Sequence, residues 1–531
     1  MQTPSRRWPW LVLLLVILST AALRWHLRAF PLERDEGEYA YAGQLLLHGV
    51  PPYTLLYTMK LPGTSFAYAA ILLGFGQTSV GIHLGLLVVN AITIGFMFLL
   101  ARRLFGDLTG IVAATAYAIL TASPAVLGFA GHATNFVLLF AVPAALLLLE
   151  AVETRRSWLL FWSGLLFGIG FLMKQPGVLL AVFGAVYILR CEWSDAQRLW
   201  SALVKHIATF AAGVALPFVA ICLLMLSYGV FGRFWFWTFS YAHEYGAITN
   251  VTEGADNFLI NFHVLLAAAP WIWLLAAMGV TAVFWSASAR NHRFFLVSFL
   301  LFSFLAVCPG LYFRRHYFIL LLPAVALLVG VAVTALTDVL KSDARDAALP
   351  WGPSAFFVVA CALSLYHQRA YLFQMSPMAA YQSIYQGSPF PEAVEIASYL
   401  RSHSAPDARI AVLGSEPEIY FYADRRSATG YIYTYGLMEP QPFAGEMQQQ
   451  MIGEIEAARP EYMVFVGVPG SFGRLATSDP LIFGWMDDYL VRNYDIVGVA
   501  DMLEPTRYLW DAAAQAYRPK APRYVKVYKR K

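Results

Sequence analysis

The chain has 531 residues, of which 59% are hydrophobic and only 13% are charged, and its formal net charge is +4. Soluble domains carry roughly 25% charged residues, so this composition predicts a polytopic membrane protein. The small net charge and the lack of a basic run exclude nucleic acid as a partner, and the four cysteines form neither a CxxC pair nor a disulfide framework.

The first predicted helix is residues 9–26, which follow Arg6 and Arg7 as the apolar core of a signal peptide would. No clean small-x-small cleavage site follows, and further apolar runs come later, so we expect an uncleaved first span. Runs long enough to cross roughly 30 Å of hydrocarbon recur over residues 1–370, which are predicted to form a transmembrane domain. We expect about eleven spans, at 9–26, 80–101, 108–128, 133–150, 157–174, 176–190, 206–228, 258–286, 294–310, 316–337 and 351–369.

Lysine and arginine concentrate in cytoplasmic loops and therefore predict how these spans are oriented. One side of the scheme carries Arg6, Arg7, Arg102, Arg103, Arg155, Arg156, Arg190, Arg198, Lys205, Arg290, Arg293, Lys341 and Arg345. This predicts an inner (plasma) membrane protein with a cytoplasmic N-terminus. Residues 27–79, 122–132, 229–257, 311–315 and those after about 370 then face the periplasm or cell exterior.

The first long outer loop begins with ERDEGEYAYAGQLLLHGVPPY, residues 33–53. Its apolar residues recur at helical spacing before two prolines, which predicts an amphipathic helix along the membrane interface. Asp35 can be the N-cap of that helix, with Glu38 completing a capping box. Glu36 and Glu38 can equally be first-turn acids that the helix dipole favours. The alternative is a functional carboxylate at the membrane surface.

Cationic residues at the outer ends of spans depart from the positive-inside pattern: Lys60 in TMKLPGT, Lys174 in FLMKQPG, and Arg314 and Arg315 before His316 in YFRRHYF. Snorkelling to lipid headgroups could explain each one alone. As a set they predict a bound phosphate at membrane depth. A carboxylate beside such cations is what glycosyl transfer from a lipid-phosphate sugar uses, with a base for the acceptor hydroxyl and cations for the departing phosphate.

Two further outer segments carry polar side chains. LGFAGHATNFVLL offers His132 and Asn135, which could hydrogen-bond a sugar or be structural residues at a helix end. FGRFWFWTFSYAHEYG, residues 231–246, contains His243 and Glu244 among aromatic residues. This segment reads either as an aromatic belt or as an interfacial helix that closes over the donor.

From Ser376 onward the composition becomes that of a soluble domain. Strands are expected at 409–415, 461–467, 494–501 and 523–530, and helices at 391–403 and 443–458. Residues 371–531 are therefore predicted to be an extracytoplasmic α/β domain.

The motifs RDEGEYAYAGQLLLHGVPPY, KLPG, GFLMKQPG and HYFILLLPAVALL resemble those of glycosyltransferase family 39. This family lies in the GT-C superfamily, with protein O-mannosyltransferases and lipid A aminoarabinose transferases as relatives, and the resemblance covers roughly residues 1–340. It implies a GT-C fold with interfacial helices in the outer loops. It also implies transfer of a sugar from a polyprenyl-phosphate donor to a protein, lipid or glycan acceptor on the outer face of the membrane.

The resemblance also assigns roles to individual residues. Asp35 matches the first-loop aspartate regarded as catalytic base or acceptor-orienting residue, and Glu36 is its usual acidic neighbour. Lys60 and Tyr317 resemble residues that contact the lipid phosphate. Arg314, Arg315 and His316 are further candidates for that contact. Candidate sugar or acceptor contacts are Tyr39, His132, Asn135, Lys174, His243 and Glu244.

The second outer loop departs from the GT-C pattern because it lacks the carboxylate that many relatives have there. We therefore predict no metal site and no required cofactor, and leave dependence on a divalent metal open. One base without a separate nucleophile predicts single displacement with inversion. Two other classes stay as alternatives. One is a lipid or sugar transporter or flippase, which would favour mid-span charges and an internal repeat. The other is a non-enzymatic envelope assembly protein that binds through its C-terminal domain.

Overall fold

A computed structural model describes residues 7–193, 200–343 and 349–531. Arg6, Arg198 and Arg345 of the expected positive-inside set lie outside these residues. The chain divides into two compact units. The membrane unit comprises Met1–Ala29, His83–Cys222 and Thr249–Ala380, and the composite unit comprises Phe30–Ile82, Leu223–Ile248 and Tyr381–Lys531.

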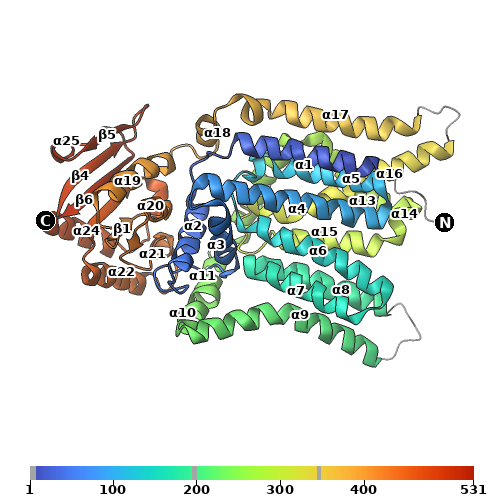
Figure 1. Cartoon of the computed structure of the whole chain (residues 1–531), viewed down its shortest axis with the longest axis horizontal. Coiled ribbons are helices and arrows are strands. Elements are labelled where there is room, and N and C mark those ends of the chain that lie inside the picture. The colour runs from blue at the N-terminus through green and yellow to red at the C-terminus, as the bar shows by residue number, and fades with distance from the viewer. Residues whose placement is uncertain (1–6, 194–199, 344–348) are drawn as a thin grey trace. The chain divides into compact units, whose positions relative to one another are not determined.

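The membrane unit is built from apolar helices (Figure 1). Its α-helices are α1 Trp8–His26, α4 Ser79–Phe105, α5 Asp107–Thr121, α6 Ala133–Thr154, α7 Ser157–Met173, α8 Val178–Trp193, α9 Trp200–Ser227, α12 Val251–Ala268, α13 Pro270–Trp285, α14 Ala287–Asn291, α15 Arg293–Leu305, α16 Leu322–Asp343 and α17 Gly352–His367. Shorter helical turns are η1 Pro124–Val126, η2 Gln175–Gly177, η4 Arg315–Leu321, η5 Leu349–Trp351 and η6 Ala370–Gln374. The first residues of α4 and the last of α9 lie in the composite unit.

Each expected span overlaps one or more apolar helices, but the lengths of these helices differ. Among the described residues six helices are long and apolar enough to cross a membrane, or seven if α12 and α13 count as one broken span. The helices α5, α7, α15 and α17 are shorter. The span expected at 258–286 is two helices that meet at an angle of 106°. The break falls at Pro270, which lacks a backbone N–H and begins α13.

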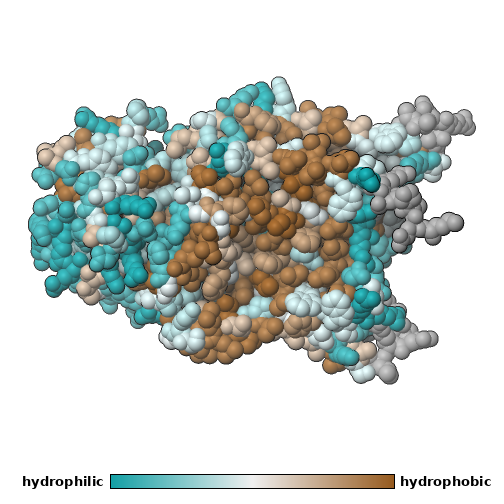
Figure 2. Space-filling view, viewed as in Figure 1, coloured by the Kyte–Doolittle hydropathy of each residue, from teal (hydrophilic) through white to brown (hydrophobic). Residues whose placement is uncertain are grey.

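The surface of these helices carries large apolar side chains. Exposed examples are Leu11, Leu15, Leu223, Phe284 and Val358, and hydrophobic residues form a broad brown area over the helices in Figure 2. An apolar patch of this extent is rare on a soluble monomer. It suits contact with hydrocarbon.

A buried arginine ties the second outer loop of the membrane unit to α1. The guanidinium of Arg24 donates to the carbonyl oxygens of Gly128 at 2.7 Å and Thr121 at 3.1 Å, and to the side-chain oxygen of Asn90 at 3.1 Å. The expected span 108–128 ends at Thr121 because Pro124 begins the turn η1. Arg24 thus fixes the loop that leads to His132.

The composite unit joins the first outer loop, the aromatic segment and the C-terminal residues. Its helices are α2 Arg34–Leu47, α3 Gly63–Phe75, α10 Phe231–Trp235, η3 Phe236–Tyr241, α11 Ala242–Ala247, α18 Pro377–Ile384, α19 Phe390–His403, α20 Glu418–Ala423, α21 Tyr435–Met438, α22 Ala444–Ala458, α23 Pro469–Phe472, α24 Leu481–Asn493 and α25 Ala512–Gln515. The first residues of α18 lie in the membrane unit.

The strands of the composite unit form one sheet in the order β2-β1-β3-β6-β4-β5. They are β1 Arg409–Leu413, β2 Arg426–Ser427, β3 Tyr462–Gly467, β4 Tyr494–Asp501, β5 Arg507–Trp510 and β6 Tyr524–Arg530. β1 is parallel to β2 and β3, whereas β6 is antiparallel to β3 and β4. The expected α/β character and all four expected strands are present, and β2 and β5 are additional.

Helix α2 packs against α3 and α20. The ring of Tyr41 stacks on that of Tyr420 at 5.2 Å between centroids, and the Tyr41 hydroxyl accepts a hydrogen bond from the Ser427 N–H at 2.7 Å. The N–H of Leu32 donates to the Tyr422 hydroxyl at 2.8 Å. Because of these contacts, residues 30–82 form a unit with residues that follow 380, whereas the sequence suggests a division at residue 370.

Candidate functional site

The N-terminus of α2 differs from the expectation in one respect. Glu33, not Asp35, is the N-cap, because Glu33 has an extended backbone and its carboxylate accepts from the Glu36 N–H at 2.9 Å. The capping box expected for Asp35 and Glu38 is therefore wrong. Asp35 lies within the first helical turn, where its side chain is available for other contacts.

Asp35 and Glu38 share one cation. The Lys60 ammonium donates to Asp35 Oδ1 at 2.7 Å and to Glu38 Oε2 at 2.7 Å. The side chains are mostly buried, with 21% of Lys60, 16% of Asp35 and 5% of Glu38 exposed. Glu38 also accepts from the Thr58 hydroxyl. Two of the residues selected from the sequence, Asp35 and Lys60, thus form a hydrogen-bonded ion pair.

Aromatic rings surround this ion pair. The Lys60 ammonium lies 4.4 Å from the centroid of the Tyr39 ring and 5.6 Å from that of Tyr433. The Tyr433 hydroxyl donates to Asp35 Oδ1 at 3.1 Å. Tyr433 is a residue that sequence reasoning missed. It belongs to the C-terminal residues, and nothing local to its sequence relates it to Asp35.

Burial and charge act in opposite directions on this cluster. Burial disfavours the Lys60 ammonium, but the carboxylates of Asp35 and Glu38 outweigh that effect and raise the pKa of Lys60 well above its ordinary value. Burial, together with the charges of Asp35 and Glu36, raises the pKa of Glu33 to about 8. The raised pKa favours the protonated form of Glu33. The neighbouring Glu36 is also buried, with 2% of its surface exposed.

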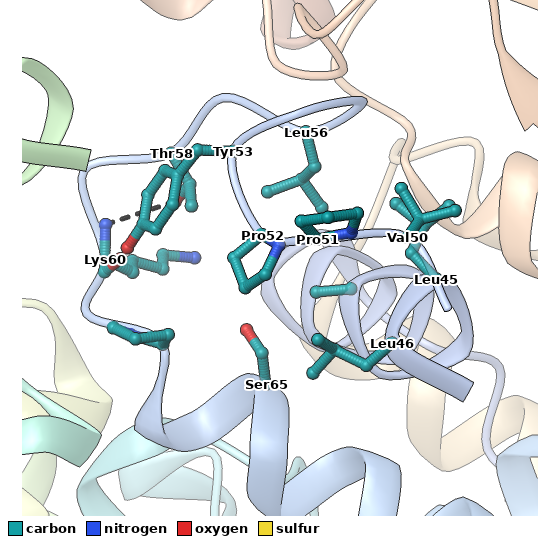
Figure 3. Close-up of a pocket in the computed structure, with 12 residues that line it drawn as sticks. Leu45, Leu46, Val50, Pro51, Pro52, Tyr53, Leu56, Thr58, Lys60 and Ser65 are labelled. Carbon is teal, nitrogen blue, oxygen red and sulfur yellow. Dashed lines mark hydrogen bonds between the residues drawn. The ribbon is translucent and has the colours of Figure 1, made fainter. Parts of the chain in front are cut away.

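A pocket lies beside Lys60 (Figure 3). It is lined by Ala42, Leu45, Leu46, Val50, Pro51, Pro52, Tyr53, Leu56, Thr58, Lys60, Pro62 and Ser65. The loop that carries Lys60 is held in shape by two hydrogen bonds, from the Tyr53 hydroxyl to the Lys60 carbonyl at 2.8 Å and from the Lys60 N–H to the Thr58 hydroxyl at 3.2 Å. The result is a largely apolar wall next to a single cation.

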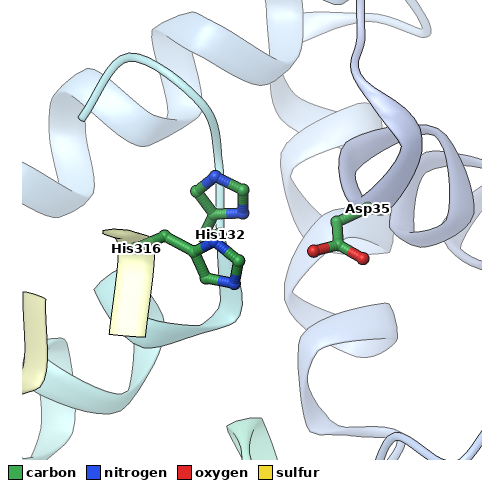
Figure 4. A group of neighbouring side chains, drawn as sticks. All are labelled: Asp35, His132 and His316. Atoms are coloured by element: carbon green, nitrogen blue, oxygen red, sulfur yellow. The ribbon is translucent and has the colours of Figure 1, made fainter. Parts of the chain in front are cut away.

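A second group of candidate residues lies in the membrane unit. Lys174 follows the last residue of α7, and its ammonium lies 3.7 Å from the centroid of the Tyr317 ring. The rings of His132 and His316 stack at 4.0 Å between centroids with 11° between their planes (Figure 4). Both are buried.

The other candidates of the membrane unit differ in exposure. The Asn135 amide donates to the His132 carbonyl at 3.4 Å, so this side chain supports the start of α6. Arg314 is exposed, with its guanidinium 5.4 Å from the Tyr312 ring, and Arg315 begins η4 as a half-buried residue. These two arginines follow each other in the chain but have different surroundings.

The aromatic segment 231–246 is helical through α10, η3 and α11, as its interpretation as an interfacial helix requires. His243 is exposed and Glu244 is half-buried. The contacts of this segment come from other residues. The Trp237 ring stacks on Tyr57 at 5.6 Å between centroids, and the Tyr241 hydroxyl donates to Glu439 at 2.7 Å. These contacts hold the segment within the composite unit.

Residues 60–225 match the family described as dolichyl-phosphate-mannose-protein mannosyltransferase. ArnT from Cupriavidus metallidurans, solved bound to undecaprenyl phosphate, has a similar structure with a TM-score of 0.57 and 15% identity, over 99% of this chain and 98% of that chain. The Archaeoglobus fulgidus oligosaccharyltransferase AglB, solved with an inhibitory peptide and a dolichol-phosphate, has a TM-score of 0.51 and 13% identity, over 96% of this chain and 75% of that chain. No curated protein matches the chain.

The chain is a multi-pass membrane protein with the GT-C fold of ArnT and AglB. The expected fold class is thereby confirmed. The family match and the fold together support the class that the motifs predict, a GT-C glycosyltransferase.

Proposed function

We propose that this protein transfers a sugar from a polyprenyl-phosphate-linked donor to a protein, lipid or glycan acceptor on the extracytoplasmic face of the inner membrane, with its N-terminus in the cytoplasm. The donor class is supported by the fold shared with proteins solved with undecaprenyl phosphate and with dolichol-phosphate. The family matched by residues 60–225 supports the same donor chemistry.

Asp35 is the base in this proposal. The single observation that carries the assignment is that its carboxylate accepts hydrogen bonds from both Lys60 and Tyr433. Asp35 takes the proton of the acceptor hydroxyl while the acceptor oxygen bonds to the anomeric carbon. The bond from that carbon to the phosphate oxygen breaks, and its electron pair leaves with the carrier phosphate. One base without a separate nucleophile predicts inversion in a single displacement. Glu36 is a supporting neighbour.

The proposed phosphate contacts are Lys60, Tyr317, Arg314, Arg315 and His316. Lys60 offers three N–H groups, of which Asp35 and Glu38 bind two. A phosphate oxygen would therefore take the third N–H or replace Glu38. The apolar wall beside Lys60 suits the isoprenoid part of a lipid phosphate. Lys174 beside Tyr317 adds a further cation.

The remaining candidates, Tyr39, His132, Asn135, Lys174, His243 and Glu244, stay as proposed sugar or acceptor contacts. We assign no required cofactor. Transfer measured after treatment with a chelator, and again after adding back a divalent metal, decides whether the reaction depends on a metal.

The test of the proposal is Asp35→Asn. Mass spectrometry of surface glycans in a deletion strain identifies the product, and transfer is then measured with purified protein in liposomes. General base catalysis contributes roughly 10²–10⁴-fold, so turnover should fall by that order. Asp107→Asn is a matched control, because Asp107 is also a first-turn aspartate bonded to a cation, Arg102, at 2.6 Å. Near wild-type turnover of folded Asp35→Asn would refute the assignment.

A further inference from the structure

A short segment of the C-terminal residues has a tyrosine at every second position. In Tyr431-Ile432-Tyr433-Thr434-Tyr435, Ile432 and Thr434 are fully buried. Tyr431 is also buried, whereas Tyr433 and Tyr435 are half-buried, and Tyr435 begins α21. We call residues 431–435 the tyrosine segment.

Each tyrosine of the segment has a different partner. The Tyr431 hydroxyl donates to Gln450 at 2.8 Å, and its ring lies 5.1 Å from that of Tyr57. The Tyr433 hydroxyl donates to Asp35 at 3.1 Å. The Tyr435 hydroxyl donates to the Gly470 carbonyl at 2.7 Å and also bonds the Arg34 guanidinium. The hydroxyl of the middle tyrosine therefore hydrogen-bonds the proposed base.

Buried hydrogen bonds fix the backbone next to Tyr433. The Thr434 N–H donates to the Ser415 hydroxyl at 2.9 Å, and the Thr434 hydroxyl donates to the Ser471 carbonyl at 3.2 Å. All three residues are fully buried. Thr434 cannot shift without breaking these hydrogen bonds. The backbone from which the Tyr433 side chain extends is therefore held in place.

The residue before Asp35 is held by the same region. The Arg34 guanidinium donates to Glu416 at 3.0 Å and to the Ser415 carbonyl at 2.5 Å. Ser415 thus bonds both the tyrosine segment and the residue adjacent to Asp35. Hydrogen bonds to this one buried serine therefore help to hold the start of α2 next to the tyrosine segment.

We propose that Tyr433 is a positioning residue, whose hydroxyl orients the Asp35 carboxylate toward the acceptor without itself contacting donor or acceptor. This inference rests on the proposed role of Asp35. The hydroxyl meets the same oxygen, Oδ1, that Lys60 bonds. Lys60 neutralises the charge of the carboxylate. The Tyr433 hydroxyl adds a hydrogen bond from a second direction, which restricts rotation of the Asp35 side chain. Misplacement of a reacting group by about 1 Å can cost roughly 10²-fold in rate.

The test is Tyr433→Phe, which removes only the hydroxyl. We expect kcat to fall roughly 10- to 100-fold, with KM for donor and acceptor and the unfolding midpoint unchanged. Tyr431→Phe is the matched control: it makes the same change in the same segment, where the hydroxyl bonds Gln450, and should leave kcat unchanged.

Three outcomes would overturn the inference. A raised KM with unchanged kcat would make Tyr433 a substrate contact. Unchanged kcat and KM would leave it without a role in turnover. A lowered unfolding midpoint that accounts for the lost activity would make it structural. The proposed function fails separately, if Asp35→Asn stays active. An inactive Asp35→Asn beside a fully active Tyr433→Phe would remove the positioning role alone.

Discussion

The guanidinium of Arg34 on α2 bonds the carboxylate of Glu416 at 3.0 Å, although the two residues are 382 positions apart. Glu416 is fully buried, and 17% of the Arg34 side chain is exposed. The Ser471 hydroxyl donates to the other carboxylate oxygen at 2.5 Å. The carboxylate of Glu416 is thus bonded on both oxygens, and it links the first outer loop to the C-terminal residues.

Glu416→Gln should destabilise the protein, because it leaves the Arg34 charge without its counter-charge. Removing one partner of a buried ion pair costs about 3–5 kcal/mol. The unfolding midpoint in detergent should fall accordingly. Asp488→Asn breaks an exposed pair with Arg492, bonded at 2.7 Å, and exposed pairs contribute about 0–1 kcal/mol. Equal midpoints for the two variants would show that the buried pair is not a structural link.

Lys60→Ala should weaken binding of undecaprenyl phosphate by at least about tenfold, since one charge-assisted contact to a phosphate is worth about 1.5–3 kcal/mol. Binding of the lipid phosphate to purified protein is the measurement. Lys341→Ala removes an exposed lysine at the end of α16 and should leave binding unchanged. Unaltered affinity in Lys60→Ala would confine Lys60 to neutralising Asp35 and Glu38.

Glu33 predicts a pH dependence of stability. Its folded-state pKa is raised to about 8, mainly by burial and then by the charges of Asp35 and Glu36. The folded protein therefore holds this proton where the unfolded chain, with an ordinary pKa of 4.5, has lost it. The contribution is fully present below about pH 4.5 and is lost as pH rises through about 8.

Glu33→Gln should flatten the decline of the unfolding midpoint between pH 5 and pH 8, roughly the window in which Glu33 titrates. The amide oxygen can still accept the cap hydrogen bond from Glu36. Glu418 has its pKa raised well above the ordinary value, by burial and the charge of Glu416, so part of the decline should persist. Glu253→Gln changes an exposed first-turn glutamate of α12 and should not alter the slope. An unchanged slope in Glu33→Gln would mean that Glu33 is ionised in the folded protein.

Gly37→Ala should destabilise the protein although alanine favours a helix. A Cβ at Gly37 would lie 2.6 Å from the Glu418 backbone nitrogen. The backbone cannot give way easily, so α2 and α20 must separate. Gly453 in α22 has open space around it, and there the same change should stabilise by about 1 kcal/mol. A higher unfolding midpoint in both variants would contradict the close packing at Gly37.

Much of the membrane unit could be predicted from the sequence because its helices are continuous apolar runs. The broken span is an instructive exception. Pro270 marks the break, but hydropathy alone joins residues 258–286 into one run. The C-terminal strands could also be predicted, since alternation of apolar residues is local information.

The start of α2 shows why the site was harder to predict. Glu33 and Asp35 both precede helical residues and both can accept a cap hydrogen bond, so the sequence alone does not decide between them. The nearness of Asp35 to Lys60, 25 residues later, could be suggested because both are predicted to lie at the outer membrane surface. Tyr433 could not, because the fold alone brings it to Asp35.

The separation of Asp35 and Tyr433 along the chain also implies a delay between their synthesis on the ribosome. Tyr433 is synthesised 398 residues after Asp35, which at about 5–20 residues per second is a delay of roughly 20–80 s. Lys60 emerges early and can neutralise Asp35 and Glu38 during that interval. The hydroxyl that completes the cluster arrives only after this delay. A nascent chain therefore carries the proposed base, neutralised but not yet oriented, until Tyr433 has been made.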